Sequence, residues 1–169
     1  MRTVAPAMLK GALDTVQREK EKDPAAGIFV AKLNSVPPMD IGGQTYFFYG
    51  ARVLGKTASG SQPFVTPHLH RKGMEPYLFQ LGTGEMNFGK VAESGDEVIW
   101  NAPVVVNRGD EFVIHEGEVH SFRNVGDDPV DFVFSCPETH LIDKSDAHPE
   151  GDRHIVKDLR NGIPEHFNK

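Results

Sequence analysis

The chain has 169 residues, 38% hydrophobic and 25% charged, which is typical of one globular domain of ordinary size. Its net charge of −6, with basic residues scattered along the sequence, argues against a nucleic-acid or membrane partner. We expect a cytoplasmic protein, because no apolar run reaches about 20 residues, the N-terminus lacks a signal-peptide core, and the single cysteine, Cys136, allows no intrachain disulfide.

The first predicted element is an amphipathic helix over residues 5–21, because Met8, Leu9, Leu13 and Val16 follow a helical spacing. From residue 27 the sequence changes to short β-type runs bounded by glycine, proline, asparagine and aspartate. Strands are predicted over residues 27–33, 44–54, 64–70, 75–81, 85–91, 97–100, 111–115, 120–124 and 130–136. So many short strands predict an all-β barrel or sandwich.

Two turn sequences and the tail complete the predicted organisation. Gly82-Thr83-Gly84 and Asp127-Asp128-Pro129 are each predicted to be hairpin turns. Residues 137–169 predict an irregular or partly helical tail, which either packs on the outside of the barrel or on a partner subunit, or forms a lid over the barrel mouth. We therefore divide a single domain, residues 1–169, into a helical extension (1–26), a β-barrel (27–136) and this tail.

A candidate metal site begins with His68 and His70, two residues apart in a predicted strand. Because side chains alternate along a strand, both imidazoles face the same side. Glu75 begins the next strand and can turn back toward them, and His120 follows the turn Glu116-Gly117-Glu118. Three imidazoles and one carboxylate suit one divalent ion, with iron expected first and manganese, nickel, zinc or copper as alternatives. Calcium or magnesium would require more oxygen ligands.

The spacing of these residues resembles the cupin superfamily. His68, His70, Glu75 and Gly82 match its first motif, HxH-x(3,4)-E-x(6)-G; Gly109, Gly117, His120 and Asn124 match its second motif, in which His115 replaces a proline. The resemblance covers about residues 45–136. It implies a small double-sheet β-barrel of jelly-roll type that holds a metal ion near one mouth through His68, His70, Glu75 and His120. The long stretch between the motifs predicts a projecting hairpin around residues 93–103.

Strand alternation also predicts the residues around the site. Residues an even number of positions from Glu75 or His120 share the inward face of the strand, which predicts that Tyr77, Phe79 and Phe122 point inward. Together with Met86 they form the predicted substrate pocket. Tyr77 either presents its phenol to a substrate or fills the barrel, and the three apolar side chains either contact a substrate or pack the core. His115 is either a proton carrier or a turn residue. No catalytic residue is assigned beyond these candidates, Tyr77 and His115.

Several other polar residues are given a structural role. Cys136 is expected to be a small buried hydrophobic residue. His140, His148, His154 and His166 lack the spacing of a second metal site and are expected on the surface. Arg71 and Lys72, on the predicted turn beside the ligands, either attract an anion at the barrel mouth or are solvated turn charges.

Three classes of function remain open. In the first, a metal-dependent enzyme binds a small oxygenated metabolite and activates dioxygen beside it; a barrel with few general bases near the metal favours this class slightly. In the second, a sugar or sugar-phosphate isomerase or epimerase uses the metal to polarise a carbonyl. In the third, a non-catalytic protein binds a small molecule through its metal. Because small barrels expose sheet edges, we also expect a homodimer.

Overall fold

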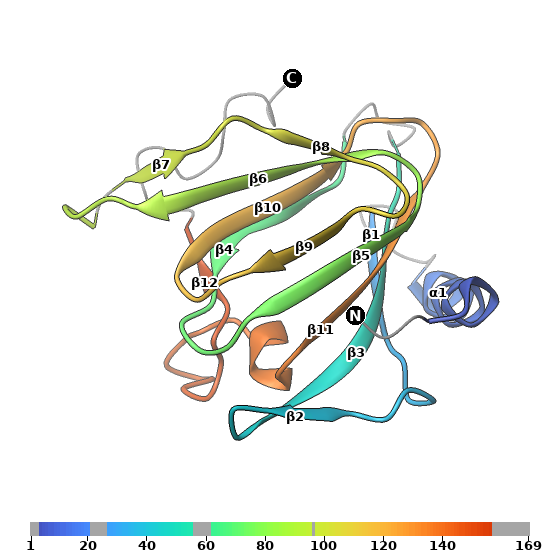
Figure 1. Cartoon of the computed structure of the whole chain (residues 1–169), viewed down its shortest axis with the longest axis horizontal. Coiled ribbons are helices and arrows are strands. Elements are labelled where there is room, and N and C mark those ends of the chain that lie inside the picture. The colour runs from blue at the N-terminus through green and yellow to red at the C-terminus, as the bar shows by residue number, and fades with distance from the viewer. Residues whose placement is uncertain (1–3, 21–26, 56–61, 96, 157–169) are drawn as a thin grey trace.

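The computed structural model describes residues 4–20, 27–55, 62–95 and 97–156. They form an α-helix, α1 (Pro6–Lys20), a 3-10 helix, η1 (Glu138–Leu141), and two antiparallel six-stranded sheets. The first sheet has the order β1 (Ile28–Lys32), β3 (Gln44–Val53), β11 (Val130–Cys136), β5 (Glu75–Leu81), β9 (Glu111–Ile114), with β2 (Met39–Ile41) paired to β3. The second has the order β12 (His154–Ile155), β4 (Phe64–Leu69), β10 (Glu118–Asn124), β6 (Gly84–Val91), β7 (Val98–Trp100), with β8 (Val104–Val106) paired to β6. The sheets face each other (Figure 1), which confirms the predicted double-sheet β fold with an N-terminal helix.

Aromatic side chains fill the space between the two sheets. Phe132 on β11 and Phe79 on β5 pack with tilted rings, their centroids 5.1 Å apart, and Phe122 on β10 reaches them from the opposite sheet at 5.3 and 5.4 Å. Their alternation along the strands follows the twofold periodicity of β structure, so that each contributes one face to a shared core. These aromatic side chains belong to one core cluster with Tyr77 and Phe134.

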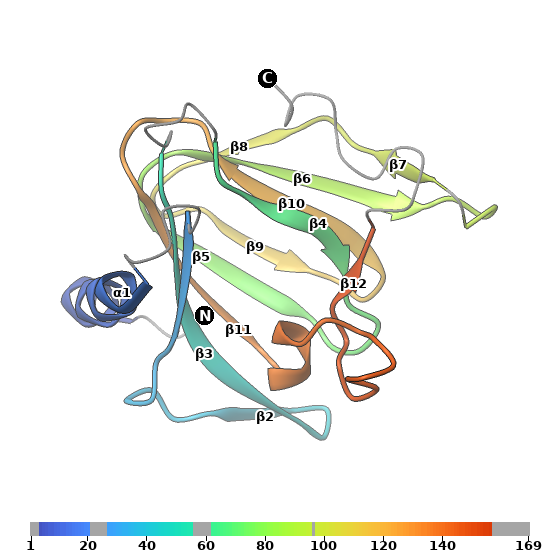
Figure 2. The same cartoon turned by 180° about the vertical axis from the view of Figure 1, so that it is seen from behind.

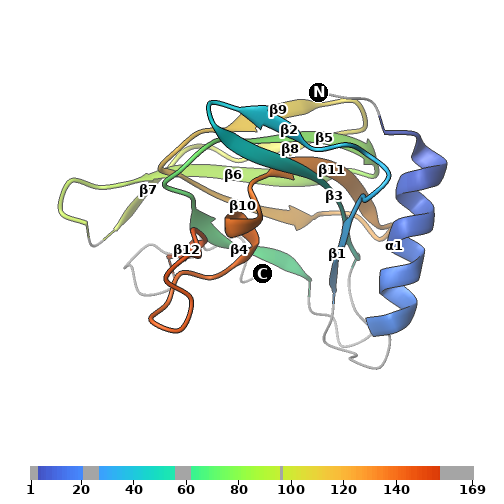
Figure 3. The same cartoon turned by 90° about the horizontal axis from the view of Figure 1, so that it is seen from below.

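Helix α1 covers the outer face of the first sheet, beside β1 and β3 (Figure 3). Leu9 and Leu13 are buried there against Phe48 and Val133, whose side chains point away from the inter-sheet core. The helix approaches the sheet so closely that a Cβ atom on Gly50 would lie 2.3 Å from Leu9 Cδ1. The helix predicted over residues 5–21 is thus confirmed over Pro6–Lys20.

The two predicted hairpin turns are instead connections between the sheets. Residues 82–83 join β5 in the first sheet to β6 in the second, and residues 125–129 join β10 in the second sheet back to β11 in the first. The two connections lie against each other, because a Cβ atom on Gly82 would be 2.7 Å from the Pro129 carbonyl oxygen. A turn sequence specifies a change of chain direction, but it does not determine which strands then pair. The β6–β7 hairpin does project from the barrel as expected (Figure 1).

Part of the tail belongs to the barrel. Strand β12 adds to the edge of the second sheet by pairing with β4. The segment from η1 to β12 lies beside β4 (Figure 2). The short strands β2, β8 and β12 were not predicted from the sequence. Residues 157–169, including His166, lie outside the described residues. No helix in the described part of the chain has the length and apolar character needed to cross a bilayer.

Candidate metal centre

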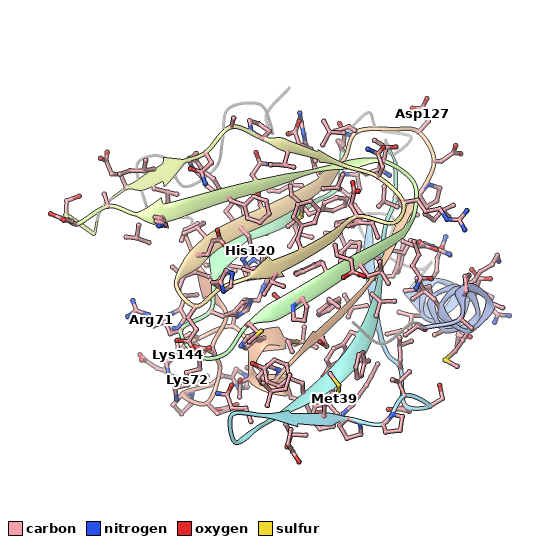
Figure 4. The ribbon with its side chains drawn as sticks, viewed as in Figure 1. Met39, Arg71, Lys72, His120, Asp127 and Lys144 are labelled. Atoms are coloured by element: carbon pink, nitrogen blue, oxygen red, sulfur yellow. The ribbon has the colours of Figure 1, made fainter. Side chains whose placement is uncertain are left out.

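The four predicted ligands come from both sheets and meet in the space between them. His68 on β4 and His120 on β10 are directly paired neighbours in the second sheet. His70 follows the end of β4, and Glu75 is the first residue of β5 in the first sheet. All four side chains are buried. Figure 4 shows His120 on the inner side of its sheet, whereas Arg71 and Lys72 lie at the rim of the molecule.

Short loop contacts hold the ligand-bearing segments together. The Gly117 N–H donates to the His70 carbonyl at 2.7 Å, and the Gly73 N–H donates to Glu116 Oε1 at 2.7 Å. These bonds join the turn after His70 to the turn before His120. From the tail, the Asp152 carboxylate accepts the N–H groups of Arg71 and Lys72 at 2.9–3.2 Å. The site is therefore fixed by three separate segments of the chain.

The hydrogen bonds of the three imidazoles determine which nitrogen faces the centre. Each Nδ1 lies against a backbone carbonyl: His68 against Thr66 at 2.7 Å, His70 against Asp152 at 3.0 Å and His120 against Glu118 at 3.3 Å. Because a carbonyl only accepts, Nδ1 carries the hydrogen and Nε2 is left with a lone pair. Such a second contact typically orients a metal-binding histidine.

The inward-facing atoms fit a divalent cation. The Nε2 atoms of His70 and His120 lie 3.3 and 3.4 Å from Glu75 Oε2. These three atoms are buried and have no hydrogen-bond partner among the residues that the structure describes. With His68, the four residues each offer one ligand atom, all within 4.8 Å of one another. Buried polar atoms normally have partners, and one cation would satisfy all of these atoms together.

The residues of the two sequence motifs thus converge between two facing antiparallel sheets. The chain has the cupin fold. Comparison of its sequence with protein-family models and with curated proteins finds no match.

Several solved structures resemble this chain in fold. They include an oxalate oxidase (20% identity, TM-score 0.46, 66% of this chain and 51% of that chain), the cupin domain of Cnp3 from Schizosaccharomyces pombe (9%, 0.45, 64% and 59%) and KdgF from Halomonas sp. (14%, 0.43, 66% and 80%). The match therefore spans about half the length of the oxalate oxidase chain. At these identities the similarity concerns the fold alone.

Burial and neighbouring charges control protonation in the candidate metal site. Burial lowers the pKa of His68 well below its ordinary value, and the nearby His120 and Arg153 lower it further, so this imidazole is held neutral. Burial alone would raise the pKa of Glu75, but hydrogen bonds that His120 and His70 donate once protonated at Nε2 outweigh burial and hold that pKa well below its usual range in the metal-free site. A neutral imidazole beside an ionised carboxylate is the protonation pattern that metal binding requires.

A pocket of about 300 Å³ adjoins the ligand cluster, and two of the four ligands, His68 and Glu75, line it. Most of its wall is apolar and comes from β1, β3, β4, β11 and the tail: Ile28, Val30, Ala51, Phe64, Val65, Phe132, Phe134 and Leu141. The polar lining residues are Thr66, His68, Glu75, Tyr77, His140 and Arg153. Because His68 and Glu75 belong both to this lining and to the ligand cluster, a molecule in the pocket lies next to the metal centre.

The predicted pocket residues are only partly found there. Tyr77 lines the pocket, and burial together with the charge of Glu75 raises the pKa of its phenol well above the ordinary value. Phe79, Met86 and Phe122 belong instead to the packed core, with at most 2% of each residue exposed. Strand alternation gave the correct side of the sheet for these residues but carries no information about depth along the barrel. His115 is exposed in the turn before β10 and does not line the pocket.

Two pocket residues were missed because they lie in the tail. His140, expected on the surface, is 1% exposed and stacks on His70 with ring centroids 3.9 Å apart and planes 4° apart. Arg153 lies just before β12. The tail has no periodicity that would indicate which of its side chains turn inward, so the sequence carries no usable signal for either residue. Cys136, by contrast, is buried as predicted, and burial raises the pKa of its thiol.

Proposed function

We propose that this cupin is a metal-dependent enzyme in which His68, His70, Glu75 and His120 bind one divalent ion, with iron first among the candidates. A small oxygenated molecule would enter the adjoining pocket and react there with dioxygen. The observation that carries the proposal is the set of buried, unpartnered Nε2 and carboxylate atoms that face one another at the wall of a pocket. Such a ligand set suits iron, manganese, nickel, zinc or copper.

When bound, the ion would supply a template for an oxygen-bearing substrate together with Lewis-acid or redox chemistry. The remaining residues of the pocket would bind and orient that substrate. The apolar walls from β1 and β11 exclude water from its body. Tyr77, whose raised pKa keeps the phenol protonated, offers a hydrogen-bond donor beside Glu75. A largely apolar wall with few bases favours dioxygen chemistry over reactions that depend on protein proton transfer.

Isomerisation is the second candidate, and a specific observation supports it. His140 and Tyr77 both line the pocket, so that one accepts and the other donates a hydrogen bond near the four ligands. Two such groups beside a metal-polarised carbonyl are the minimum for moving a proton between neighbouring carbons. Oxygen uptake on addition of diketones, thiols or aromatic diols would support the first candidate, whereas turnover of sugars without oxygen uptake would support the second.

The ligand assignment is tested by the substitution His120→Ala. Loss of a group that only orients a ligand lowers metal affinity by about 10–100-fold, and we expect the loss of a ligand itself to lower it further. The circular-dichroism spectrum of the barrel should be retained. Elemental analysis and titration against a competing chelator measure this. His148→Ala is the matched control, because His148 is exposed and pairs only with Glu150 among the described residues. Equal metal content in both variants would show that the ligand set is wrong. A full metal site that is silent in oxygen and isomerase assays would indicate a non-catalytic binding protein.

A further inference from the structure

Arg153 is the positively charged side chain in the described lining of the pocket. Its backbone is fixed on both sides, since its N–H donates to the Ile142 carbonyl at 3.1 Å and its carbonyl accepts the Lys144 N–H at 2.9 Å. The guanidinium donates through Nη1 to Asp143 Oδ1 at 2.8 Å. Because an arginine has five N–H donors in a planar fork, this bond leaves other donors for an anion in the pocket.

The ion pair between Arg153 and Asp143 does not commit the guanidinium. The Asp143 side chain is 60% exposed, so water screens its charge and the pair contributes little. Glu75 is the acidic residue of the described pocket lining, and it faces the metal-ligand imidazoles. A ligand carboxylate next to apolar walls would therefore be the better-shielded partner for Arg153.

The same pocket contains a buried hydrogen-bond acceptor. His140 Nε2 donates to the Lys72 carbonyl at 2.6 Å, which leaves Nδ1 with a lone pair. The His140 side chain is fully buried, and its Nδ1 has no partner in the part of the chain that the structure describes. A buried polar atom without a partner is unfavourable. A hydroxyl group on a molecule in the pocket would satisfy it.

We propose that the pocket recognises a small hydroxycarboxylic acid with an apolar body. Its carboxylate pairs with Arg153, its hydroxyl donates to Nδ1 of His140, and its apolar body lies against Val30 and Phe132. This inference deepens the proposed function by naming the class of substrate, and it rests on that function only for the reaction that follows binding.

Isothermal titration calorimetry with three related probes tests the proposal, using the zinc-loaded and the chelator-treated protein. The probes are mandelate, which carries all three features, mandelamide, which lacks the charge, and phenylacetate, which lacks the hydroxyl. We expect mandelate to bind most tightly to both forms, and mandelamide to bind at least about tenfold more weakly, because charge-assisted hydrogen bonds to arginine are the strong ones. Absence of mandelate binding in both forms would overturn the proposal.

Variants assign each contact. Arg153→Gln should weaken mandelate binding at least about tenfold without changing mandelamide binding. Asp143→Asn should leave mandelate binding nearly unchanged, because the exposed Asp143 carboxylate does not commit the guanidinium. His140→Phe keeps an aromatic ring on His70 but should abolish the preference for mandelate over phenylacetate. The matched control is Arg123→Gln, since Arg123 pairs with Glu85 away from the described pocket lining. Unchanged mandelate affinity in Arg153→Gln, or an unchanged preference in His140→Phe, would contradict the assignment.

The metal content of the same samples separates this inference from the proposed function. Mandelate binding that depends on Arg153 in a protein unable to take up metal would retain the carboxylate site and reject the metal chemistry. Full metal loading with affinity independent of Arg153 would reject the carboxylate site and retain the metal centre.

Discussion

At Gly73, between His70 and Glu75, the backbone has a φ of 79°, a conformation that is unfavourable for residues other than glycine. A Cβ atom there would lie 2.5 Å from the hydroxyl oxygen of Tyr46, which is buried and accepts the Met74 N–H at 3.0 Å. Left-handed backbone strain alone costs about 1–2 kcal/mol, and we expect Gly73→Ala to lower the free energy of unfolding by more than this. We also expect it to weaken metal binding, because it displaces the loop that joins His70 to Glu75. Urea unfolding and metal titration measure these effects.

Gly95 provides a matched control for this substitution. It has a similar φ of 77° in the projecting β6–β7 turn, but no atom of the described chain lies within 4 Å of the place that a Cβ atom would take. Gly95→Ala should therefore cost only the backbone strain and leave metal affinity unchanged. Equal losses in the two variants would mean that the contact with Tyr46 has no effect on the site.

Single residues also show where sequence reasoning succeeds and where it ends. His68, His70, Glu75 and His120 could be recognised because short spacings on regular strands fix which side chains share a face. His140 and Arg153 could not, because their positions depend on the β12–β4 pairing and on the Asp152 carboxylate that holds the Arg71 and Lys72 amides. Those are contacts between segments about 80 residues apart in the chain.

At the scale of elements, replacing either of two glycines by alanine should change the stability of the packed helix α1, but with opposite signs. On β3, Gly50→Ala would place a Cβ atom 2.3 Å from Leu9 Cδ1, and Leu9 is buried with little room to move. We expect this overpacking to cost about 1–3 kcal/mol of unfolding free energy. Gly11, within α1, has no described atom within 4 Å of an added Cβ, so Gly11→Ala should stabilise the protein by about 0.5–1 kcal/mol. Urea unfolding compares the two; a neutral Gly50→Ala would show that the helix is loosely docked.

The strands themselves were largely predictable, and their pairing was not. Runs such as 75–81 and 130–136 have the composition and bounds that the structure gives to β5 and β11. The turns at residues 82–84 and 127–129 indicated hairpins, yet each carries the chain from one sheet to the other. The difference arises because pairing is decided by which apolar faces must be covered together, and turn composition does not contain that information.

At the scale of the whole molecule, the buried titratable groups predict that acid destabilises the metal-free protein. Burial lowers the pKa of His68 from the ordinary value of 6.5, and burial with repulsion between the His70 and His140 imidazoles, were both protonated, lowers that of His140. Below pH 6.5 the unfolded chain therefore binds more protons than the folded chain, and the free energy of unfolding falls by at most about 1.4 kcal/mol per pH unit for each histidine. Glu75 has a lowered pKa, so its contribution is present above pH 4.5 and is lost as the pH falls through the folded-state value.

Urea unfolding of the metal-free protein between pH 7.5 and 5.5 measures the contribution of the histidines, because Glu75 stays ionised in both states over most of this range. We expect stability to fall over this interval, and His140→Phe to reduce the slope, since it removes one of the two groups held neutral. His148→Ala is the control, because this histidine side chain is 61% exposed. A bound divalent ion should hold stability constant to lower pH until protons displace it from the imidazoles. A flat profile for the metal-free protein would mean that the two buried imidazoles take up protons without loss of the fold.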